Sequence, residues 1–238
     1  TWQNYQKTSD IMLSGAARVY KQATREMFLD FRGTYHSVAE TIKLMALSPL
    51  INADTLEQRV KSVAMLATAL QGERSLSAIQ LGYPNGDFFI VRPLTSVNLR
   101  QTFSAPDTAQ YVADHVSSGS DGERRLIRLF FDEQLHEISS EAPISTGYDP
   151  RSRPWYQNAG TQVRAIKPYL FYFIGKVGTT VTLKTPTSGV VIAADITLEQ
   201  LSQTIRQHQI TPGSEVVLME AEGRALAYRE PGQLITRT

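Results

Sequence analysis

The stretch that decides the fold reads Gly147-Tyr148-Asp149-Pro150-Arg151-Ser152-Arg153-Pro154-Trp155-Tyr156-Gln157-Asn158-Ala159. Pro150 is well placed in the first turn of a helix, where the missing N–H of proline costs no hydrogen bond. Asp149 precedes it and is typical of a side chain that holds a turn. The stretch therefore predicts a turn followed by a brief helix over 150–159.

Side chains in and after this stretch have the chemistry of a small-molecule pocket. Arg153 offers a planar fork of donors that suits a carboxylate bound through both oxygens. Asp195, at the end of a predicted strand, can accept a hydrogen bond from an ammonium group. Rigid aromatic walls with polar edges are available from Tyr148, Trp155, Tyr156 and Tyr169. Together these groups would recognise a zwitterion.

The composition is that of a soluble globular protein with a sizeable core, since 42% of the 238 residues are hydrophobic and 20% are charged. The formal net charge of +1 gives no indication of a nucleic-acid partner. Cysteine is absent, which excludes disulfides, thiol catalysis and cysteine-bound metals. No apolar run approaches the roughly 18 residues that cross a bilayer. Because the chain starts Thr1-Trp2-Gln3 without a signal-like segment, we interpret it as a piece of a longer protein.

Two amphipathic helices are predicted before the first strand. The first is expected to cover 1–47, with aromatic residues that form core or the seam of a homodimer. Its apolar positions recur at spacings of three and four, and they are Ala16, Tyr20, Ala23, Met27, Phe31, Tyr35, Val38, Ile42 and Met45. The second runs from an N-cap at Asp54 to Gly72, with a buried stripe that includes Leu66.

From residue 76 the pattern changes to strands joined by turns. The pair 76–81 and 88–94 flanks Asn85-Gly86, which is a strong hairpin-turn signal. Further strands are predicted over 109–117, 124–131, 135–138, 169–174, 179–183 and 189–194. A helix over 197–207 and a second hairpin, 215–220 with 224–228, are predicted to follow. The likeness of the two hairpins indicates two related modules.

Residues 147–159 closely resemble the signature of the double Cache family, which comprises paired PAS-like sensor modules outside the membrane in chemoreceptors, sensor kinases, cyclases and cyclic-dinucleotide enzymes. Lys167-Pro168-Tyr169 is similar to the family's Pro-Tyr element, and 189–198 to its closing strand with a following Asp. The order of predicted elements also fits, so the resemblance covers nearly the whole chain. It implies an α+β fold in which a long N-terminal helix packs along two PAS-like modules, each with an antiparallel sheet.

The resemblance also implies domain boundaries and ligand contacts. The helix would cover 1–47, the membrane-distal ligand-binding module 48–196, and the membrane-proximal module 197–238. This last module is partial, because a single hairpin cannot bury a sheet face alone. In the family's amino-acid-sensing subset, the ligand is contacted by the residues that match Tyr148, Arg153, Trp155, Tyr156, Tyr169 and Asp195. Arginine and tryptophan bind the carboxylate there, while aspartate and tyrosine bind the amino group.

Some of these residues also have purely structural interpretations. Trp155 is nearly as compatible with a core anchor, since a buried tryptophan is common in small domains. Asp195 is compatible with a cap for the helix that starts near residue 197. The basic group formed by Arg124, Arg125 and Arg128 is interpreted as a solvated strand face.

We therefore expect the periplasmic, extracytoplasmic ligand-sensing domain of a bacterial inner-membrane receptor, with an amino acid as ligand. No enzymatic activity, cofactor, metal or nucleic-acid partner is expected, since catalytic motifs are absent and the four histidines lack metal-ligand spacing. This expectation leaves open whether the parent receptor carries a cytoplasmic kinase, cyclase or cyclic-dinucleotide enzyme domain. Three alternatives stay open: an amine, organic acid or purine-type ligand, a ligand-free module that acts through protein contacts or dimerisation, and a hydrolase.

Overall fold

The computed structural model describes residues 18–19, 21–22, 25–26, 29, 32–197, 199–200, 217–219 and 225–228. The chain divides into two compact units, one of 1–35 with 198–238 and one of 36–197. A helix over 32–45 confirms the last part of the predicted long helix. Much of its earlier part, and most of the helix predicted over 197–207, lie outside the described residues. The module boundaries expected at 47 and 196 stay a prediction.

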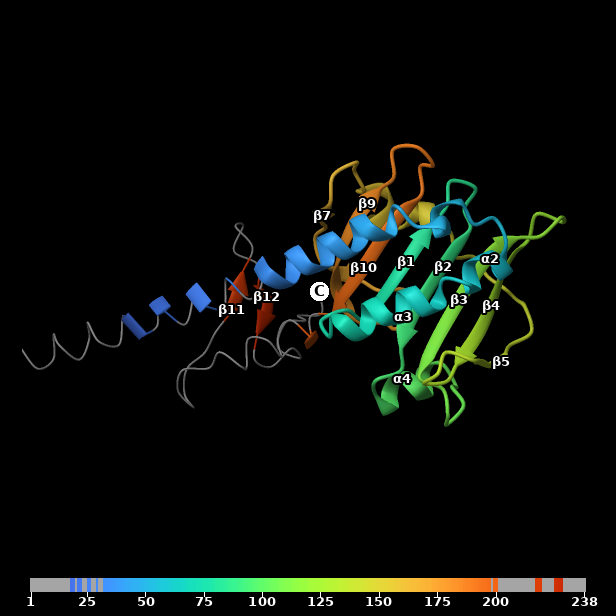
Figure 1. Cartoon of the computed structure of the whole chain (residues 1–238), viewed down its shortest axis with the longest axis horizontal. Coiled ribbons are helices and arrows are strands. Elements are labelled where there is room, and N and C mark those ends of the chain that lie inside the picture. The colour runs from blue at the N-terminus through green and yellow to red at the C-terminus, as the bar shows by residue number, and fades with distance from the viewer. Residues whose placement is uncertain are drawn as a thin grey trace, which may run out of the picture. The chain divides into compact units, whose positions relative to one another are not determined.

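An antiparallel sheet forms the centre of the larger unit (Figure 1). Its strands are β1 (Ala78–Gly82), β2 (Phe88–Pro93), β3 (Tyr111–Ser118), β4 (Arg124–Phe131), β5 (Glu137–Ser140), β6 (Ile144–Ser145), β7 (Arg164–Ala165), β8 (Tyr169–Leu170), β9 (Val177–Lys184) and β10 (Val191–Thr197). They follow the order β5-β4-β3-β2-β1-β10-β9-β7, while β6 pairs with β4 and β8 with β9. Because β10 lies beside β1, residues far apart in the chain meet in the middle of the sheet.

The second predicted hairpin is confirmed as a separate pair of strands. In it, β11 (Val217–Met219) pairs antiparallel with β12 (Ala225–Tyr228). The sheet of 36–197 and this hairpin agree with an α+β fold of the predicted PAS-like kind.

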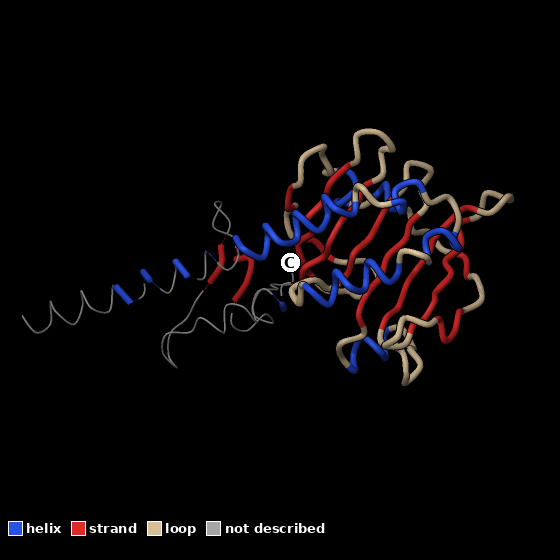
Figure 2. Tube along the Cα trace, in the orientation of Figure 1, coloured by secondary structure: helices blue, strands red, loops and turns tan. Residues whose placement is uncertain are grey.

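Helices cover one face of the sheet (Figure 2). They are the part of the first helix over 36–45, the turn η1 (Pro49–Asn52), α2 (Leu56–Val60) and α3 (Val63–Gly72). The predicted stripe is buried, with Leu66 at its centre. The predicted N-cap is wrong by one residue, because the side chain of Thr55, not that of Asp54, accepts from the N–H of Gln58. Residues 61–62 form a turn, which divides the predicted helix in two.

Tight turns join neighbouring strands as predicted. Gly86 in the β1–β2 turn has a φ of +91°, and Gly122 between β3 and β4 has a φ of +78°, a region that favours glycine. The strand predicted over 169–174 is wrong in its second half. It ends with β8, and the N–H of Phe171 then donates to the carbonyl of Lys176 over 2.8 Å, which closes a turn.

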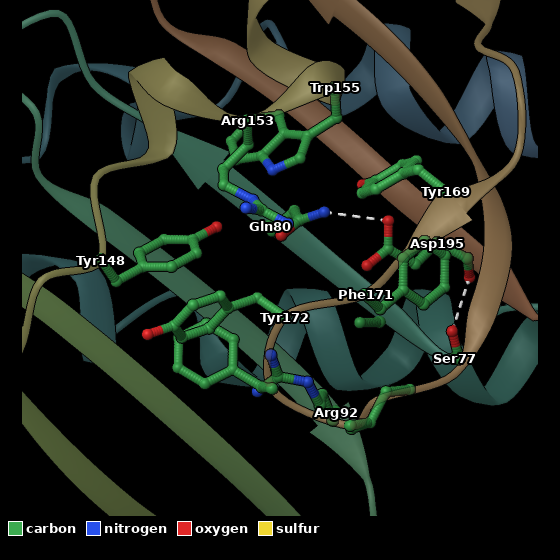
Figure 3. A pocket seen from close by; sticks show the side chains of 13 residues that line it. Ser77, Gln80, Arg92, Tyr148, Arg153, Trp155, Tyr169, Phe171, Tyr172 and Asp195 are labelled. Atoms are coloured by element: carbon green, nitrogen blue, oxygen red, sulfur yellow. Dashed lines mark hydrogen bonds between the residues drawn. The ribbon is translucent and has the colours of Figure 1, made fainter. Parts of the chain in front are cut away.

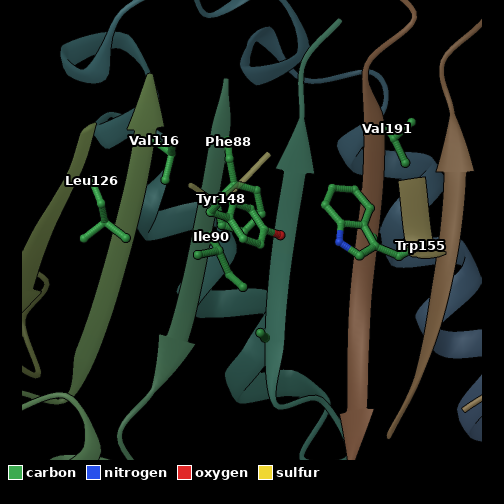
Figure 4. Close-up of a cluster of buried hydrophobic side chains, with 9 residues drawn as sticks. Phe88, Ile90, Val116, Leu126, Tyr148, Trp155 and Val191 are labelled. Carbon is green, nitrogen blue, oxygen red and sulfur yellow. The ribbon is translucent and has the colours of Figure 1, made fainter. Parts of the chain in front are cut away.

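The opposite face of the sheet is covered by the signature segment. Two short turns, η2 (Pro150–Ser152) and α5 (Pro154–Gln157), replace the single helix predicted there, and Asp149 holds the first of them by accepting from the N–H of Arg151. Trp155 is 1% exposed. It belongs to a buried cluster (Figure 4) whose other members are Ala78, Phe88, Ile90, Val116, Leu126, Tyr148, Val191 and Ala193. The segment is therefore part of the core on this face.

Gly82, in β1 beneath this segment, has no room for a side chain. A Cβ atom there would lie 2.7 Å from Cη2 of Trp155 and 2.8 Å from Cδ2 of Tyr156. We expect Gly82→Ala to lower the free energy of unfolding by about 1–3 kcal/mol, the usual cost of overpacking, and to change the tryptophan fluorescence. Urea unfolding tests this, with Gly147→Ala as the control because a Cβ atom at Gly147 meets nothing within 4 Å. Equal losses in the two variants would contradict it.

Candidate ligand pocket

A small cavity lies between the sheet and the signature segment, and it measures about 20 Å³ (Figure 3). Its polar floor includes one residue from each of three neighbouring strands, Gln80 of β1, Arg92 of β2 and Asp195 of β10, whose side chains point to the same face of the sheet. The polar lining is formed by Ser77, Gln80, Arg92, Arg153 and Asp195. The walls are largely aromatic and are formed by Tyr148, Trp155, Tyr169, Phe171, Tyr172 and Phe173. Five of the six expected ligand-contact residues therefore meet at one cavity.

Asp195 lies in β10 and presents one free carboxylate oxygen. Its Oδ1 accepts from Oγ1 of Thr180 over 2.6 Å and from Nε2 of Gln80 over 2.9 Å. Within the described residues Oδ2 has no hydrogen-bond partner, and the carboxylate points into the cavity (Figure 3). The side chain is thus held by one oxygen and offers the other to whatever occupies the cavity.

Burial raises the pKa of Asp195 from its ordinary 3.8 to about 7. The hydrogen bond from Thr180, the charge of Arg92 and the hydrogen bond from Gln80 all act to lower this pKa and offset burial only in part. A buried carboxyl group in this state gains from a cationic partner, because such a partner stabilises the ionised form. An ammonium group in the cavity would provide that partner.

Arg153 lies at the other side of the cavity, at the N-cap of α5. Its Nη2 donates to the carbonyl of Leu170 over 3.4 Å, and its guanidinium carbon lies 5.4 Å from the ring centre of Tyr172. In the described part of the chain no carboxylate pairs with it. Arg151 differs, because it forms an ion pair with Asp149 over 2.7 Å. Of these two arginines, Arg153 is therefore the one available to an anion.

Two tyrosines complete the polar edge of the cavity. The hydroxyl of Tyr169 lies 2.9 Å from Oγ1 of Thr180. Because that threonine donates to Asp195, the tyrosine hydroxyl is the donor to it, and the three groups form a chain. Burial raises the pKa of both Tyr148 and Tyr169 above the ordinary value of 10, so both hydroxyls are neutral donors.

Tyr156 is the expected contact residue that does not line the cavity. Its ring packs edge-on against Trp155, with ring centres 5.7 Å apart, and lies over Gly82. Tyr156 therefore packs against the indole ring of Trp155 and not into the cavity.

Gln80 and Arg92 line the cavity but were not predicted from the sequence. The available signal was weak, because each is one polar residue within a buried strand. Their roles depend on pairing between strands: Gln80 reaches Asp195 across 115 residues of sequence, and Arg92 reaches Asp114 on β3 over 3.1 Å.

The interpretation of the basic group on β4 as a solvated face is wrong for two of its three residues. Arg128 binds the fully buried Asp114, with Nε donating to Oδ1 over 2.7 Å. Arg124 donates through Nε to the carbonyl of Tyr148 over 2.8 Å. Arg125 does lie at the surface, where it pairs with Asp121. The pocket face of the sheet continues across β3 and β4, and this is why these arginines turn inward.

The turn over 171–176 covers the cavity with two aromatic side chains. Phe173 stacks on Phe88, with ring centres 5.9 Å apart and planes 8° apart, and it also contacts Tyr148. Tyr172 is 55% exposed and contacts the ring of Phe173, with ring centres 5.1 Å apart. The small volume of the cavity follows from this cover.

In the described part of the chain, no group of three or more His, Cys, Asp or Glu side chains is arranged to hold a metal ion. None of the helices described is long and apolar enough to cross a membrane.

The chain is similar to parts of an adenylate cyclase and of methyl-accepting chemotaxis proteins. No protein-family model matches the chain. It is 28% identical over 177 residues to adenylate cyclase 1 of Rhizobium meliloti, covering 73% of this chain and 27% of the relative. It is 25% identical over 149 residues to the methyl-accepting chemotaxis protein McpG of Pseudomonas putida, covering 56% and 24%. The chain thus spans about a quarter of the length of these relatives.

Solved structures with a similar fold are the ligand-binding domains of chemoreceptors. That of Tlp3 from Campylobacter jejuni, in complex with L-valine, has a TM-score of 0.53 at 18% identity, over 92% of this chain and 73% of that one. That of PctC from Pseudomonas aeruginosa, in complex with GABA, has a TM-score of 0.51 at 15% identity, over 93% and 77%. The PAS-like fold that the resemblance of residues 147–159 implies is confirmed: the chain shares its fold with these chemoreceptor ligand-binding domains.

Proposed function

We propose that the chain is the extracytoplasmic ligand-sensing domain of a bacterial transmembrane receptor and that it binds an amino acid in this cavity. The main support is that an acidic and a basic side chain with unused hydrogen-bonding atoms line the same aromatic cavity. Among the described residues, Asp195 has a free carboxylate oxygen and Arg153 has no carboxylate partner. The names of the relatives agree, since chemotaxis receptors and a cyclase are signalling proteins. Two of the similar structures contain L-valine and GABA, which each combine an amine with a carboxylate.

The proposed orientation follows from the charges. The carboxylate of the ligand binds Arg153 and the indole N–H of Trp155, while the ammonium group binds Oδ2 of Asp195. Tyr169 contributes through its hydroxyl, which lies on the same chain of hydrogen bonds as that carboxylate. The ring of Tyr148 covers the apolar part of the ligand.

Ligand binding requires the cover of the cavity to move. A volume of about 20 Å³ holds roughly one water molecule and not an amino acid. Tyr172 and Phe173 line the cavity, and both lie on the turn 171–176. We therefore infer that this turn swings outward when a ligand binds and closes over it afterwards.

A receptor function also requires that binding favours one of two conformations, because a ligand shifts an equilibrium only by its differential affinity for the two states. The helix that packs on the sheet over 36–45 is the proposed output element, since its residues Val38 and Ile42 are fully buried. The output activity itself, whether kinase, cyclase or chemotaxis signalling, belongs to the rest of the parent protein.

The hydrolase alternative is disfavoured by the contacts of Ser77, the aliphatic hydroxyl on the cavity lining. Its Oγ donates to the backbone carbonyl of Asp195 over 3.0 Å, and no described side chain is placed beside it as a base. A nucleophile needs a base within hydrogen-bond distance to act at neutral pH.

The binding proposal is tested by thermal unfolding with a panel of amino acids, amines, organic acids and nucleobases, followed by calorimetry on those that stabilise. A ligand at 100 times its dissociation constant should stabilise the protein by about 2.7 kcal/mol. We expect amino acids to do so and Arg153→Ala to weaken their binding roughly tenfold to a hundredfold, the cost of a lost charged hydrogen bond.

The matched control is Arg151→Ala, two residues away, whose guanidinium is paired with Asp149 and does not line the cavity. It should leave the affinity within about twofold, as is usual for a surface substitution. Stabilisation by amines or organic acids alone would replace the amino-acid assignment. Absence of any stabilising compound would overturn it in favour of a module that acts through protein contacts.

A further inference from the structure

Arg92 is a buried cation on the floor of the cavity. It shares its face of β2 with Phe88 and Ile90, both members of the buried cluster on the pocket side of the sheet. The residue is 5% exposed, and it lines the cavity beside Gln80 and Asp195. A guanidinium in such a place needs partners, since an unpaired buried charge is costly.

The partners of Arg92 leave most of its donors unused. In the described part of the chain its single hydrogen bond runs from Nη1 to Oδ2 of Asp114, over 3.1 Å. Asp114 also accepts twice from Arg128, over 2.7 and 3.2 Å, so one carboxylate serves two guanidinium groups. Two ring faces also lie near the guanidinium carbon, that of Phe103 at 5.2 Å and that of Phe173 at 4.9 Å. The charge of Asp195 acts on Arg92 as well, without a hydrogen bond between the two. Among the described residues, four of the five N–H donors thus have no hydrogen-bond acceptor.

The cover of the cavity is also the cover of Arg92. Phe173 belongs to the turn that has to move before a ligand can bind, and its ring now lies against this guanidinium. When the turn moves, the guanidinium of Arg92 loses its contact with the ring of Phe173 and becomes accessible to the ligand. A ligand with an anionic group at this point would satisfy donors that the aromatic ring cannot satisfy.

The strand register places Arg92 and Asp195 at the two ends of one row. Ala78 on β1 pairs with Asp195 on β10, and the pairing of Ile79 with Val91, extended by one position, sets Ala78 opposite Arg92. The two charged residues are therefore separated by two strand spacings, roughly 10 Å between backbones. Ala78 between them is small and leaves the row open. Arg153 approaches from the other side of the cavity, so the site has two cations and one anion.

We propose that Arg92 binds a second acidic group on the ligand, so that the domain prefers amino acids with an acidic side chain. This rests on the proposed function, in which Asp195 binds the ammonium group and Arg153 the α-carboxylate. A neutral amino acid would leave the donors of Arg92 facing an apolar side chain. A side-chain carboxylate provides the bidentate partner that a guanidinium fits best.

The first test needs no mutation. Calorimetry compares L-aspartate with L-asparagine and L-glutamate with L-glutamine, because each pair has the same shape and differs in one charge. We expect whichever of aspartate and glutamate binds more tightly to bind roughly tenfold to a hundredfold more tightly than its own amide. Affinities within twofold of each other in both pairs would overturn the inference and leave the proposed function intact. If these four ligands fail to bind while another amino acid binds, the inference fails and the proposed function stands. If no amino acid binds at all, the proposed function fails, and this inference fails with it.

The second test is Arg92→Gln. It should reduce the advantage of the acid over its amide to no more than about twofold, because the charge that distinguishes the two ligands then has no partner at this position. Retained binding of the amide shows in the same titration that the variant is folded. An acid preference that survives in Arg92→Gln would overturn the inference and assign the preference to another residue. Should the variant not fold, the comparison of acids with amides in the unmodified protein still decides.

Discussion

Replacing Asp195 with asparagine is expected to abolish amine binding and, at alkaline pH, to stabilise the ligand-free protein. The first effect should be roughly a hundredfold or more in affinity, because the partner of a buried charge is removed. The second effect, on stability, follows from the environment of the carboxyl group. The group is buried, and among the described residues hydrogen-bond donors reach only its Oδ1. Asparagine can accept the same two bonds through Oδ1 and brings no charge.

The sign of the pH effect follows from the raised pKa. In the unfolded chain the carboxyl group has its ordinary pKa of 3.8, and in the fold the pKa is about 7. Well below the unfolded pKa the carboxyl group is protonated in both states, so its ionisation does not lower the free energy of unfolding. As the pH rises to 7 the unfolded state ionises first, so stability is lost, to a total of about 4 kcal/mol above pH 7. The asparagine side chain would be neutral in both states, and this loss would disappear.

Thermal unfolding at pH 5 and at pH 8 checks this. Asp195→Asn should raise the melting temperature by several degrees at pH 8 and by much less at pH 5, since the lost stability grows between those values. Asp121→Asn is the control of opposite sign, because Arg125 lowers the pKa of this exposed carboxyl to about 2. An equal gain at both pH values would contradict the raised pKa of Asp195, and retained amine binding would contradict its role as the partner of the amine.

The same pKa predicts how binding depends on pH in the unmodified protein. An ammonium ligand binds the ionised carboxylate, so its affinity should rise by up to about tenfold per pH unit below pH 7 and level off above it. Calorimetry from pH 5 to pH 8 checks this, and any residual binding by Asp195→Asn should lack the dependence.

Much of the cavity lining could be predicted because several of its residues stand close together in the sequence. Tyr148, Arg153 and Trp155 fall within eight positions of one another, and their chemistry is that of a pocket whatever fold presents them. The residues of such a local motif stay close together even where the secondary structure around them is predicted wrongly. The helix predicted over 150–159 is two short turns, yet Arg153 and Trp155 still reach the same cavity.

The residues that escaped prediction depend on strand register, which no local pattern contains. Arg92 stands in a strand that is otherwise apolar, and its position opposite Ala78 follows only from the pairing of β2 with β1. Gln80 shares a hydrogen-bond network with Asp195 because β10 enters the sheet beside β1. Arg128 was placed in solvent for the same reason, since its partner Asp114 lies on the neighbouring strand.

Replacing Arg59 with methionine is expected to cost about 3–5 kcal/mol of folding free energy, the usual penalty for breaking a buried ion pair from one side. The arginine is fully buried in α2 and donates to the carbonyl of Ala53 over 3.1 Å and to Asp87 over 2.9 Å. It also meets Nδ1 of His115 at 3.2 Å. Burial and the adjacent guanidinium lower the pKa of that histidine to about 4, so its ring is neutral and accepts.

These contacts fasten the helical layer to the turn between β1 and β2. The guanidinium carbon of Arg59 lies 4.0 Å from the ring centre of Tyr83, at the start of the turn, and Asp87 ends it. From the pocket side, Arg124 and Arg151 donate to the carbonyls of Gly86 and Pro84 in the same turn. The turn is therefore held from both faces of the sheet, and Arg59 provides the hold on the helical side.

Urea unfolding of Arg59→Met, Asp87→Asn and the double variant measures the ion pair directly. The single arginine variant leaves a buried carboxylate unpaired, and the double variant does not, so the double loss should be smaller than the sum of the two single losses. Lys61→Met is the matched control: two residues along the chain, its side chain is 71% exposed and pairs with Glu57 at 3.4 Å, a surface contact worth at most about 1 kcal/mol. A loss in Arg59→Met no larger than in Lys61→Met would mean that the helices are held to the sheet by apolar contacts alone. A large loss with strong coupling would establish the turn over 83–87 as the point where the helical layer and the pocket face share one set of polar contacts.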